Sequence, residues 1–514
     1  MRNWTPLLLS LVVLATACKR EELTPSAPIA QGDVLQQRAN VVPLPTEGPL
    51  SQSDLDRIVI QRLQDNNSFR WDDVDLRTRW SATLYNDHAI AIGYQPANLG
   101  DIGDAIHQVD INKADWRAVH DALINLVLEG LNKDRSTPFR LEEILIEDDA
   151  KLPILTLRFT DLAVFTQLYN LKNVRYIEPL DYWPADDADR STSGCSGSGA
   201  ALNASDVSTI TPNARLPWNF NNHNIPAAWQ TAQGQGITVG VIDAGISSAQ
   251  PLIGSNFNNG ESNMGRSIST GFTFGNSAFS SCTHGTSMSG LATGPRNDQG
   301  ATSGVGYKSN LVFLRGCEDV VLNLSSELTG VKNALVQMGD NPAVRVVSMS
   351  IGTPFSSGVL TDGVNYAHGR GKMLMAAAGT SFSWISWWGV IFPAALSKCV
   401  AVTGVKENGS KCASCHDGSQ VDLTICMERN ASSSRNSLGL PPSGSTPTYI
   451  GGSSAATATA AGIAALVWSV RPTATREQVL QCLTSTAQFA NAPSSSKGFG
   501  NINAAAAVNC ALAL

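Results

Sequence analysis

Three short segments in the second half of the chain carry an acid, a base and a hydroxyl group, in that order. Asp243 follows the apolar run 237–242, His284 precedes Gly-Thr-Ser-Met-Ser-Gly, and Ser454 follows Gly451-Gly-Ser. A serine hydroxyl is a weak nucleophile until a base takes its proton, and the base needs a third group that orients it. A carboxylate at the end of a buried strand can accept the ring N–H of that base. The pattern predicts nucleophilic attack on an acyl group.

Two other serines compete with Ser454 for the role of nucleophile. Ser287 lies only three residues after His284, so one helical turn would hold both groups and no second element would bring nucleophile and base together. Ser453 is the immediate neighbour and the second alternative. We favour Ser454 because a glycine pair precedes it and allows an unusual turn. It also begins the small-residue helix predicted at 455–470, whose free N–H groups and dipole favour negative charge.

From about residue 215 to residue 510 the sequence resembles the subtilisin-like serine proteases, the subtilase family. The three segments follow the order Asp, His, Ser that subtilisin uses. Arg-Pro-Thr-Ala-Thr-Arg-Glu from residue 471 resembles the family's next helix, and Gly-Phe-Gly-Asn-Ile-Asn from residue 498 resembles its terminal signature. The resemblance implies an α/β fold, with a subtilisin-like parallel sheet and helices on both faces.

The activity implied by this resemblance is that of a serine endopeptidase acting on polypeptide substrates. His284 would take the proton from Ser454, which attacks the peptide carbonyl, and Asp243 would stabilise the imidazolium. Water would then hydrolyse the acyl-enzyme. The rival hypothesis is a surface binding protein that keeps the fold with weak or no catalysis. The intact acid, base and hydroxyl favour the enzyme.

Thr380 departs from the family pattern at the position that binds the oxyanion. Subtilases carry Asn there, and losing this donor in subtilisin costs about 2.7–4 kcal/mol of transition-state stabilisation. The Thr380 hydroxyl is shorter but can donate one hydrogen bond, and the backbone N–H of Ser454 would supply another. Ser453, Ala455 and Ala458 replace the usual Thr, Met and Pro. These three changes affect packing and not the reacting atom.

The resemblance also indicates where a peptide would bind. The substrate backbone would pair, as an added strand, with Ser350, Ile351 and Gly352. The primary specificity pocket would be lined by 376–379 and 392–394, which include Ala378, Gly379 and Pro393. Three tryptophans lie between these segments and either rim an apolar site or pack the core of an insertion: Trp384, Trp387 and Trp388.

Apolar runs that alternate with helical spacing support the same fold. Buried strands are predicted at 237–242, 311–314, 344–351, 373–378 and 399–405. Helices are predicted at 325–338, 361–368 and 455–470, and 219–229 resembles the family's opening helix. This alternation predicts a parallel sheet with helices on both faces.

A smaller α+β domain is predicted over residues 51–184. Helices are predicted near 53–63, 114–131 and 162–171, and strands at 80–85, 89–94, 152–159 and 174–179. The stretch 173–178 resembles the closing strand of the subtilase prodomain, which implies that this domain is an intramolecular inhibitor of its own peptidase. The alternative is a separate binding domain. The family's prodomain is shorter, so residues 51–110 are an elaboration or are unrelated.

Low-complexity segments divide the rest of the chain. Residues 185–213 are rich in Ser, Gly and Asp and predict a linker, in which the precursor would be processed. Residues 18–50 are rich in Pro, Gln and Ser and predict a tether. Residues 1–17 have the pattern of a signal peptide, and the peptidase domain is expected at 214–514.

The first residues predict export. Arg2, the apolar stretch 7–14 and the small residues up to Ala17 form a secretory signal. Leu-Ala-Thr-Ala-Cys18 resembles a bacterial lipoprotein cleavage box, and the following Lys-Arg-Glu-Glu resembles a surface-export signal. Lipidation of Cys18 would place the protein at the outer membrane or cell surface, with membrane contact through the lipid anchor only. The alternative is a secreted protein whose signal peptide is cut near Ala17.

Composition excludes several classes of function. Of the 514 residues 15% are charged, and the net charge of -7 gives no basic footprint for nucleic acid. Beyond the N-terminus no apolar run reaches the roughly 18 residues of a membrane span. No acidic cluster has calcium-loop spacing, so we expect no cofactor and leave calcium open.

Nine cysteines besides Cys18 are present among the ten of the chain, and export favours disulfides. Cys482 and Cys510 flank the last predicted helix and are expected to pair. Two further pairs could come from Cys399, Cys412, Cys415 and Cys426. Since nine is odd, one thiol is left over, and Cys195 is a candidate. Cys412-Ala-Ser-Cys415-His416 could be half a zinc site, but no second ligand pair stands at a familiar spacing, so disulfides are favoured.

Overall fold

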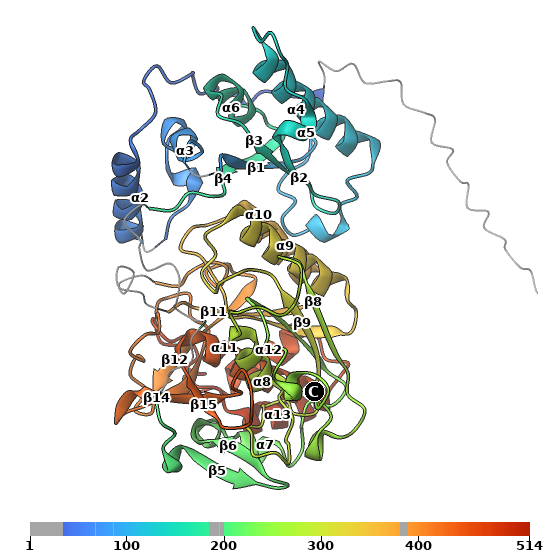
Figure 1. The fold of residues 1–514 in the computed structure, drawn as a ribbon, viewed down its shortest axis with the longest axis vertical. Coiled ribbons are helices and arrows are strands. Elements are labelled where there is room, and N and C mark those ends of the chain that lie inside the picture. Colours follow the sequence, from blue (N-terminus) through green and yellow to red (C-terminus); the bar gives the residue numbers. More distant parts are fainter. Residues whose placement is uncertain (1–33, 67, 86, 185–194, 196–199, 381–388) are drawn as a thin grey trace, which may run out of the picture.

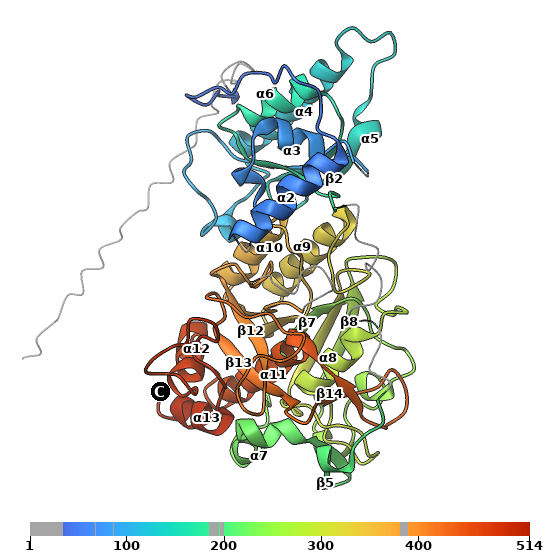
Figure 2. The same ribbon diagram turned by 90° about the vertical axis from the view of Figure 1, so that its left-hand side faces the viewer.

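The computed structural model describes residues 34–66, 68–85, 87–184, 195, 200–380 and 389–514. Two domains lie one above the other, with the N-terminal domain in blue and teal at the top of Figure 1 and the larger domain below it. Figure 2 shows the same stacking from the side. The expected signal peptide, Cys18 and the tryptophans at 384, 387 and 388 lie outside the described residues.

The N-terminal domain is an antiparallel sheet covered by helices. Its strand order is β2-β3-β1-β4. The strands are β1 (Ala89–Tyr94), β2 (Leu145–Asp148), β3 (Ile154–Arg158) and β4 (Val174–Pro179). The helices are α2 (Gln52–Asn66), α3 (Leu76–Ala82), α4 (Ala114–Asn132), α5 (Leu141–Ile144) and α6 (Leu162–Tyr169), with short 3-10 turns at Trp71–Asp73 and Ile106–Gln108. Buried side chains of β1, β3 and α6 form the core.

The strand predicted at 80–85 is wrong, because these residues belong mostly to helix α3 and the turn after it. Asp75 caps the helix, since its side chain accepts a hydrogen bond from the backbone N–H of Thr78. Leu76 and Trp80 lie four residues apart, one helical turn, and both are buried. The apparent alternation of apolar and polar residues was too short to distinguish the period of a strand from that of a helix.

The tether expected at 18–50 is also wrong over its last part, because the chain is bound to the N-terminal domain from about residue 36. The N–H of Gln36 donates to Asn173 Oδ1, and that of Val42 donates to Asn170 Oδ1, each at 2.8 Å. Asn170 and Asn173 are buried and need hydrogen-bond partners, which this segment supplies. The Arg38 guanidinium adds a bond of 2.8 Å to the carbonyl of Val174.

The larger domain is built on a nine-stranded sheet, in the order β15-β14-β13-β12-β11-β10-β7-β9-β8. All pairs from β13 to β8 are parallel, and β14 and β15 join antiparallel at one edge. The strands are β7 (Thr238–Asp243), β8 (Ile268–Phe272), β9 (Asn310–Arg315), β10 (Val344–Met349), β11 (Met373–Ala377), β12 (Cys399–Lys406), β13 (Leu423–Arg429), β14 (Ser432–Gly439) and β15 (Thr448–Ile450). The predicted α/β fold and parallel sheet are confirmed.

Helices cover both faces of this sheet. They are α7 (Ile225–Ala228), α8 (His284–Thr293), α9 (Ser325–Asp340), α10 (Gly358–Gly369), α11 (Gly452–Val470), α12 (Arg476–Ser485) and α13 (Ala504–Leu512), with 3-10 turns at Trp218–His223, Pro251–Ile253 and Gly260–Ser262. In Figure 1, α9 and α10 lie directly beneath the N-terminal domain. Helix α11 is long and apolar enough to cross a membrane, but it is buried inside the domain and is therefore its core helix.

The linker expected at 185–213 is shorter than predicted. A 3-10 turn at Ala204–Asp206 leads into β5 (Val207–Ile210), which pairs antiparallel with β6 (Ala214–Pro217). Asp206 is buried and accepts hydrogen bonds from the Arg429 guanidinium at 2.8 Å and the Tyr449 hydroxyl at 2.5 Å. These bonds join the chain to the larger domain ahead of the expected boundary at residue 214.

Disulfides join Cys482 to Cys510, Cys412 to Cys415, and Cys195 to Cys282. The first is the predicted pair, but the proposal that Cys195 is left over is wrong. Cys399 and Cys426 are buried and unpaired, as is Cys317. Parallel register explains this, because Cys426 lies opposite Val405, six residues along β12 from Cys399. Six residues of strand span about 20 Å, far beyond the reach of a disulfide.

Candidate active site

The predicted acid and base are in direct contact at one edge of the parallel sheet. Asp243 is the last residue of β7, and His284 is the first residue of α8. The Nδ1–H of His284 donates to Asp243 Oδ1 at 2.8 Å. Both side chains are buried. Since a carboxylate accepts this bond, Nδ1 carries the hydrogen and Nε2 is the basic nitrogen of the neutral ring.

Ser454 is brought to the same edge by a neighbouring strand. It lies in the first turn of α11, and its hydroxyl donates to the carbonyl of Ser350 at 3.4 Å. The Ser350 hydroxyl donates in return to the carbonyl of Ser454 at 3.0 Å. Ser350 follows β10, where Met349 lies opposite Ile242 of β7, the residue before Asp243.

In the described residues no hydrogen bond joins Ser454 to His284. The serine side chain has staggered rotamers, and hydrogen bonds between catalytic groups often form only when substrate is bound. The structure thus shows the pair Asp243–His284 and a serine hydroxyl at the same sheet edge, turned toward Ser350.

Both alternative serines are engaged elsewhere. The Ser287 hydroxyl is buried and donates to the carbonyl of Leu440 at 2.8 Å. Ser453 Oγ is fully buried and accepts the N–H of Gly379 at 3.0 Å. Ser454 is partly exposed, unlike these two. Ser454 is thus the most exposed of the three, and its role as nucleophile stays a prediction.

Gly452 adopts the unusual backbone that the glycine pair predicted. Its φ of +75° lies in the left-handed region, which favours glycine. A Cβ atom at this position would lie 2.7 Å from Thr380 Oγ1, so the backbone of the turn approaches Thr380 closely. Thr380 Oγ1 also lies 3.4 Å from Ser453 Oγ. Thr380 therefore lies beside the start of α11, where the first N–H groups lack partners within the helix.

The strand edge expected to bind substrate is paired within the chain. The N–H of Gly352 donates to the carbonyl of Val320, and the N–H of Leu322 donates to the carbonyl of Gly352, both at 2.9 Å. Thr353 pairs antiparallel with Phe392. The expectation that Gly352 is open to an added peptide strand does not hold in this structure, because both of its backbone groups have partners. The sequence contains no local pattern that indicates this pairing.

The two segments expected to line the specificity pocket lie together. The N–H of Ile391 donates to the carbonyl of Ala378 at 3.0 Å. A Cβ atom on Gly352 would lie 2.7 Å from Ile391 Cδ1, so this side chain lies against the Gly352 backbone. Pro393 follows two residues later. Ile391 was not among the residues predicted to line the pocket, although it immediately precedes the segment that was.

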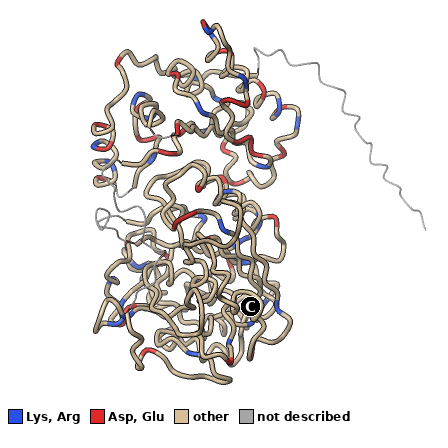
Figure 3. Tube along the Cα trace, in the orientation of Figure 1, with Lys and Arg blue, Asp and Glu red and all other residues tan. Residues whose placement is uncertain are grey.

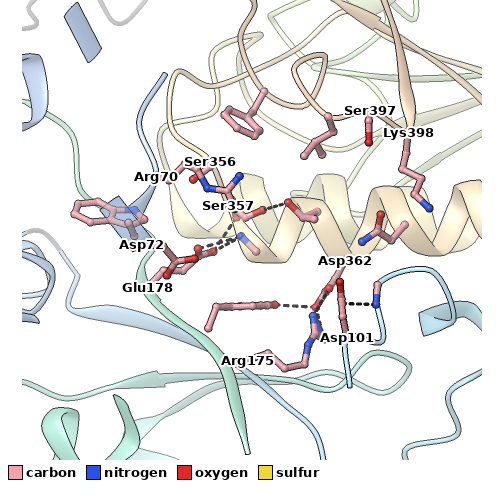
Figure 4. A pocket seen from close by; sticks show the side chains of 18 of the residues that line it. Arg70, Asp72, Asp101, Arg175, Glu178, Ser356, Ser357, Asp362, Ser397 and Lys398 are labelled. Carbon is pink, nitrogen blue, oxygen red and sulfur yellow. Dashed lines mark hydrogen bonds and ion pairs between the residues drawn. The ribbon is translucent and has the colours of Figure 1, made fainter. Parts of the chain in front are cut away.

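The N-terminal domain binds α10 through Glu178, Arg175 and Tyr176 (Figure 4). Glu178 accepts the N–H of Gly358 at 2.8 Å and the hydroxyl of Ser357 at 3.0 Å. Burial raises the pKa of Glu178 to about 7. Arg175 forms an ion pair with Asp362, which also accepts the Tyr176 hydroxyl at 3.0 Å. These groups line a cavity of about 550 Å³ between the two domains.

The N-terminal domain also contacts helix α9. Asp181 accepts the N–H of Ser325, the first residue of α9, at 2.5 Å. Lys332 of α9 is buried and binds Glu147 at 3.0 Å as well as Asp149. Figure 3 shows that charged residues are denser in the N-terminal domain than in the larger one. The contact is therefore polar and charged along both helices.

An aromatic cluster completes this contact near the substrate edge. The rings of Tyr182 and Trp183 meet the ring of Phe355 at centroid distances of 6.1 and 5.4 Å. Phe355 follows Gly352 by three residues. Asp181 and these rings thus hold the segments on both sides of the Val320–Gly352 pairing.

Metal-ligating side chains do not gather in the described part of the chain. It contains no group of three or more His, Cys, Asp or Glu side chains that could hold a metal ion. Cys412 and Cys415, considered as half a zinc site, are joined to each other in a disulfide.

Comparison with known proteins gives consistent matches. Residues 234–501 match the family described as the Subtilase family. The "Extracellular protease" of Xanthomonas campestris pv. campestris is 30% identical over 343 residues, which cover 59% of this chain and 58% of that protein. The "M-protease" of Shouchella clausii is 28% identical over 301 residues, which cover 58% of this chain and 69% of that protein.

Among solved structures, MycP1 with the N-terminal propeptide removed is similar at 22% sequence identity and a TM-score of 0.46. The match covers 57% of this chain and 98% of that one. A protease from Pseudoalteromonas arctica is similar at 23% identity and a TM-score of 0.45, covering 56% of this chain and 94% of that one.

Proposed function

Because the chain belongs to the subtilase family, we propose that it is a serine endopeptidase that hydrolyses peptide bonds through an acyl-enzyme. The observation that carries this proposal is the 2.8 Å hydrogen bond from His284 Nδ1 to Asp243, at the sheet edge where Ser454 lies. It leaves Nε2 as the base for a serine hydroxyl.

The proposed mechanism uses these groups in turn. His284 Nε2 takes the proton of Ser454 Oγ as this oxygen attacks the substrate carbonyl, and Asp243 stabilises the resulting imidazolium. The N–H of Ser454 and the hydroxyl of Thr380 bind the oxyanion. His284 then protonates the leaving amine. Water then attacks the acyl-enzyme while His284 Nε2 takes its proton, and His284 returns that proton to Ser454 Oγ as the acid product leaves.

The N-terminal domain acts in this proposal as an intramolecular inhibitor. A peptide substrate needs free backbone groups on Gly352 to add as a strand. Val320 and Leu322 occupy those groups at 2.9 Å. Asp181 binds the start of α9 just after Leu322, and Trp183 packs on Phe355 just after Gly352. The N-terminal domain would thus inhibit by keeping Gly352 paired with Val320 and Leu322, so that a substrate strand cannot add there.

Export and processing belong to the same proposal. The segment 1–17 would direct export, and Cys18 would carry the lipid anchor. The Xanthomonas relative, described as an extracellular protease, supports export. Globomycin should make a larger precursor accumulate, and an unchanged size would reject lipidation. Cleavage in 185–213 would be autocatalytic, and equal processing of Ser454→Ala and the wild type would reject this.

The proposed activity is tested with the processed chain and an unfolded polypeptide. Hydrolysis should be lost in Ser454→Ala whose linker 185–213 has been cut by an added protease, because this variant would not process itself. The rival function is a binding protein with the same fold, and the replacement of the family's Asn by Thr380 favours it. Capture of the polypeptide without cleavage by the wild type would select this rival.

A further inference from the structure

We propose that the turn formed by residues 412–416, here called the cysteine turn, positions Gly379 and Thr380 for oxyanion binding. The turn contacts them through its backbone, and the His416 ring packs against Gly379. This inference rests on the proposed function, in which Thr380 donates to the oxyanion. His416 would not touch substrate, so it is a positioning residue rather than a catalytic one.

The backbone of Gly379 and Thr380 is held from two directions. On one side the N–H of Gly379 donates to Ser453 Oγ at 3.0 Å, which joins it to the residue before the nucleophile. On the other side the N–H of His416 donates to the carbonyl of Gly379 at 2.9 Å, and Thr380 pairs antiparallel with Cys415. The cysteine turn therefore holds Gly379 and Thr380 on the side away from Ser453.

The His416 ring fills the space that a side chain at residue 379 would need. Gly379 has a φ of +125°, and a Cβ atom there would lie 2.4 Å from His416 Nδ1. Nδ1 lies 3.0 Å from the carbonyl of Gly389, so it carries the hydrogen and donates. Burial lowers the pKa of His416 to about 4, so the ring is neutral at neutral pH. The neutral ring packs against Gly379 and donates to the carbonyl of Gly389.

Gly389 in turn leads into the segment of the specificity pocket. Two residues later, the N–H of Ile391 donates to the carbonyl of Ala378 at 3.0 Å. His416 thus contacts both segments that meet beside the nucleophile, one through Gly379 and one through Gly389. Loss of the ring would leave a cavity against both.

The Cys412–Cys415 disulfide closes the turn immediately before His416. The turn is further held by the N–H of Ala413, which donates to Glu428 at 2.7 Å, and by the Thr403 hydroxyl, which donates to the carbonyl of His416 at 2.5 Å. Because Cys415 is the residue that pairs with Thr380, restricting this turn restricts Thr380.

The expected consequence is selective for the chemical step. Donors to an oxyanion act only at about 2.7–3.1 Å from its position, and a misplacement of about 1 Å can cost on the order of 100-fold in rate. Among the described residues, no hydrogen bond joins His416 to Gly352, where a peptide strand would add. A change at His416 should therefore lower kcat far more than it raises KM.

The test compares His416→Ala and His416→Asn with the wild type, in the processed enzyme and per titrated active site. Asn can place its N–H near the position of Nδ1. We expect kcat of His416→Ala to fall about 10- to 100-fold, with KM within about threefold, and His416→Asn to keep most of the wild-type kcat. His223→Ala is the matched control, because His223 is also buried and its Nδ1 lies 2.7 Å from the carbonyl of Ile502. It should lower Tm without lowering kcat per active site.

Three results would overturn the positioning role: an unchanged kcat in His416→Ala, an equal loss in His416→Asn, or a rise in KM alone. Failure of the proposed function is distinguishable, because the wild type itself would then hydrolyse nothing. A readout independent of activity is amide hydrogen exchange in the full chain carrying Ser454→Ala. Adding His416→Ala should speed exchange at Gly379, and adding His223→Ala should not. Equal exchange in both would also reject the inference.

Discussion

His284 donates its Nδ1–H to Asp243 at 2.8 Å, and both side chains are buried at the carboxyl end of β7. A buried carboxylate in this position fixes the tautomer of the ring and directs Nε2 to act as a base. Replacing Asp243, or the groups beside Ser454, should therefore change the activity in ways that can be measured.

Replacing Asp243 with Asn should lower kcat by about 10⁴-fold, the order of magnitude measured for this change in another serine protease. The amide can donate to Nδ1 and so stabilise the tautomer in which Nε2 carries the hydrogen. Steady-state hydrolysis of a peptide substrate measures the effect, with circular dichroism to establish folding. A loss of less than tenfold would show that Asp243 does not orient the base.

Replacing Thr380 with Asn should preserve or raise peptidase activity. The longer amide restores the donor that subtilases use, whose loss in subtilisin costs about a hundred- to thousandfold in turnover. The measurement is kcat/KM on one peptide substrate, beside Thr380→Ala, which removes the hydroxyl and should lower activity. A large fall in Thr380→Asn would mean that Thr380 serves another purpose at the start of α11.

Glu178 predicts how pH affects the hold of the N-terminal domain. Burial raises the pKa of Glu178 to about 7 from its usual 4.5, so the docked carboxyl binds a proton more tightly than a solvated one. The stabilisation is fully present below about pH 4.5 and is lost as pH rises through about 7, an effect of up to about 3 kcal/mol.

Urea unfolding of the full chain carrying Ser454→Ala measures this dependence between pH 4.5 and 8. Adding Glu178→Gln places a neutral group at the start of α10, so that this part of the pH dependence should disappear. If both chains lose stability equally as pH rises, Glu178 is not the responsible group.

Much of the larger domain could be predicted because its central strands are buried on both faces. Such strands appear as continuous apolar runs, and β7, β9, β10, β11 and β12 were all recognised this way. The edge strand β8 was missed, since its side chains are partly or fully exposed and form no apolar run. Asp243 ends the apolar run and is the last residue of β7, at the sheet edge where a parallel sheet presents its functional groups.

Long-range pairings were not predictable from local pattern. The disulfide of Cys195 joins residues 87 positions apart, and its flanking residues gave no sign of a partner. The bonds between Gly352 and residues 320–322 are made by backbone atoms, which every residue carries. Likewise, the sequence indicated that Glu178 lies on a closing strand but not that its carboxylate caps α10.

The most direct test of Ser454 as the nucleophile is covalent labelling of the processed chain with a fluorophosphonate probe. The wild type should be labelled, Ser454→Ala cut in the linker 185–213 by an added protease should lose the label, and Ser453→Ala and Ser287→Ala should keep it. Absence of labelling in the processed wild type, or labelling that persists in Ser454→Ala, would contradict the proposed peptidase mechanism.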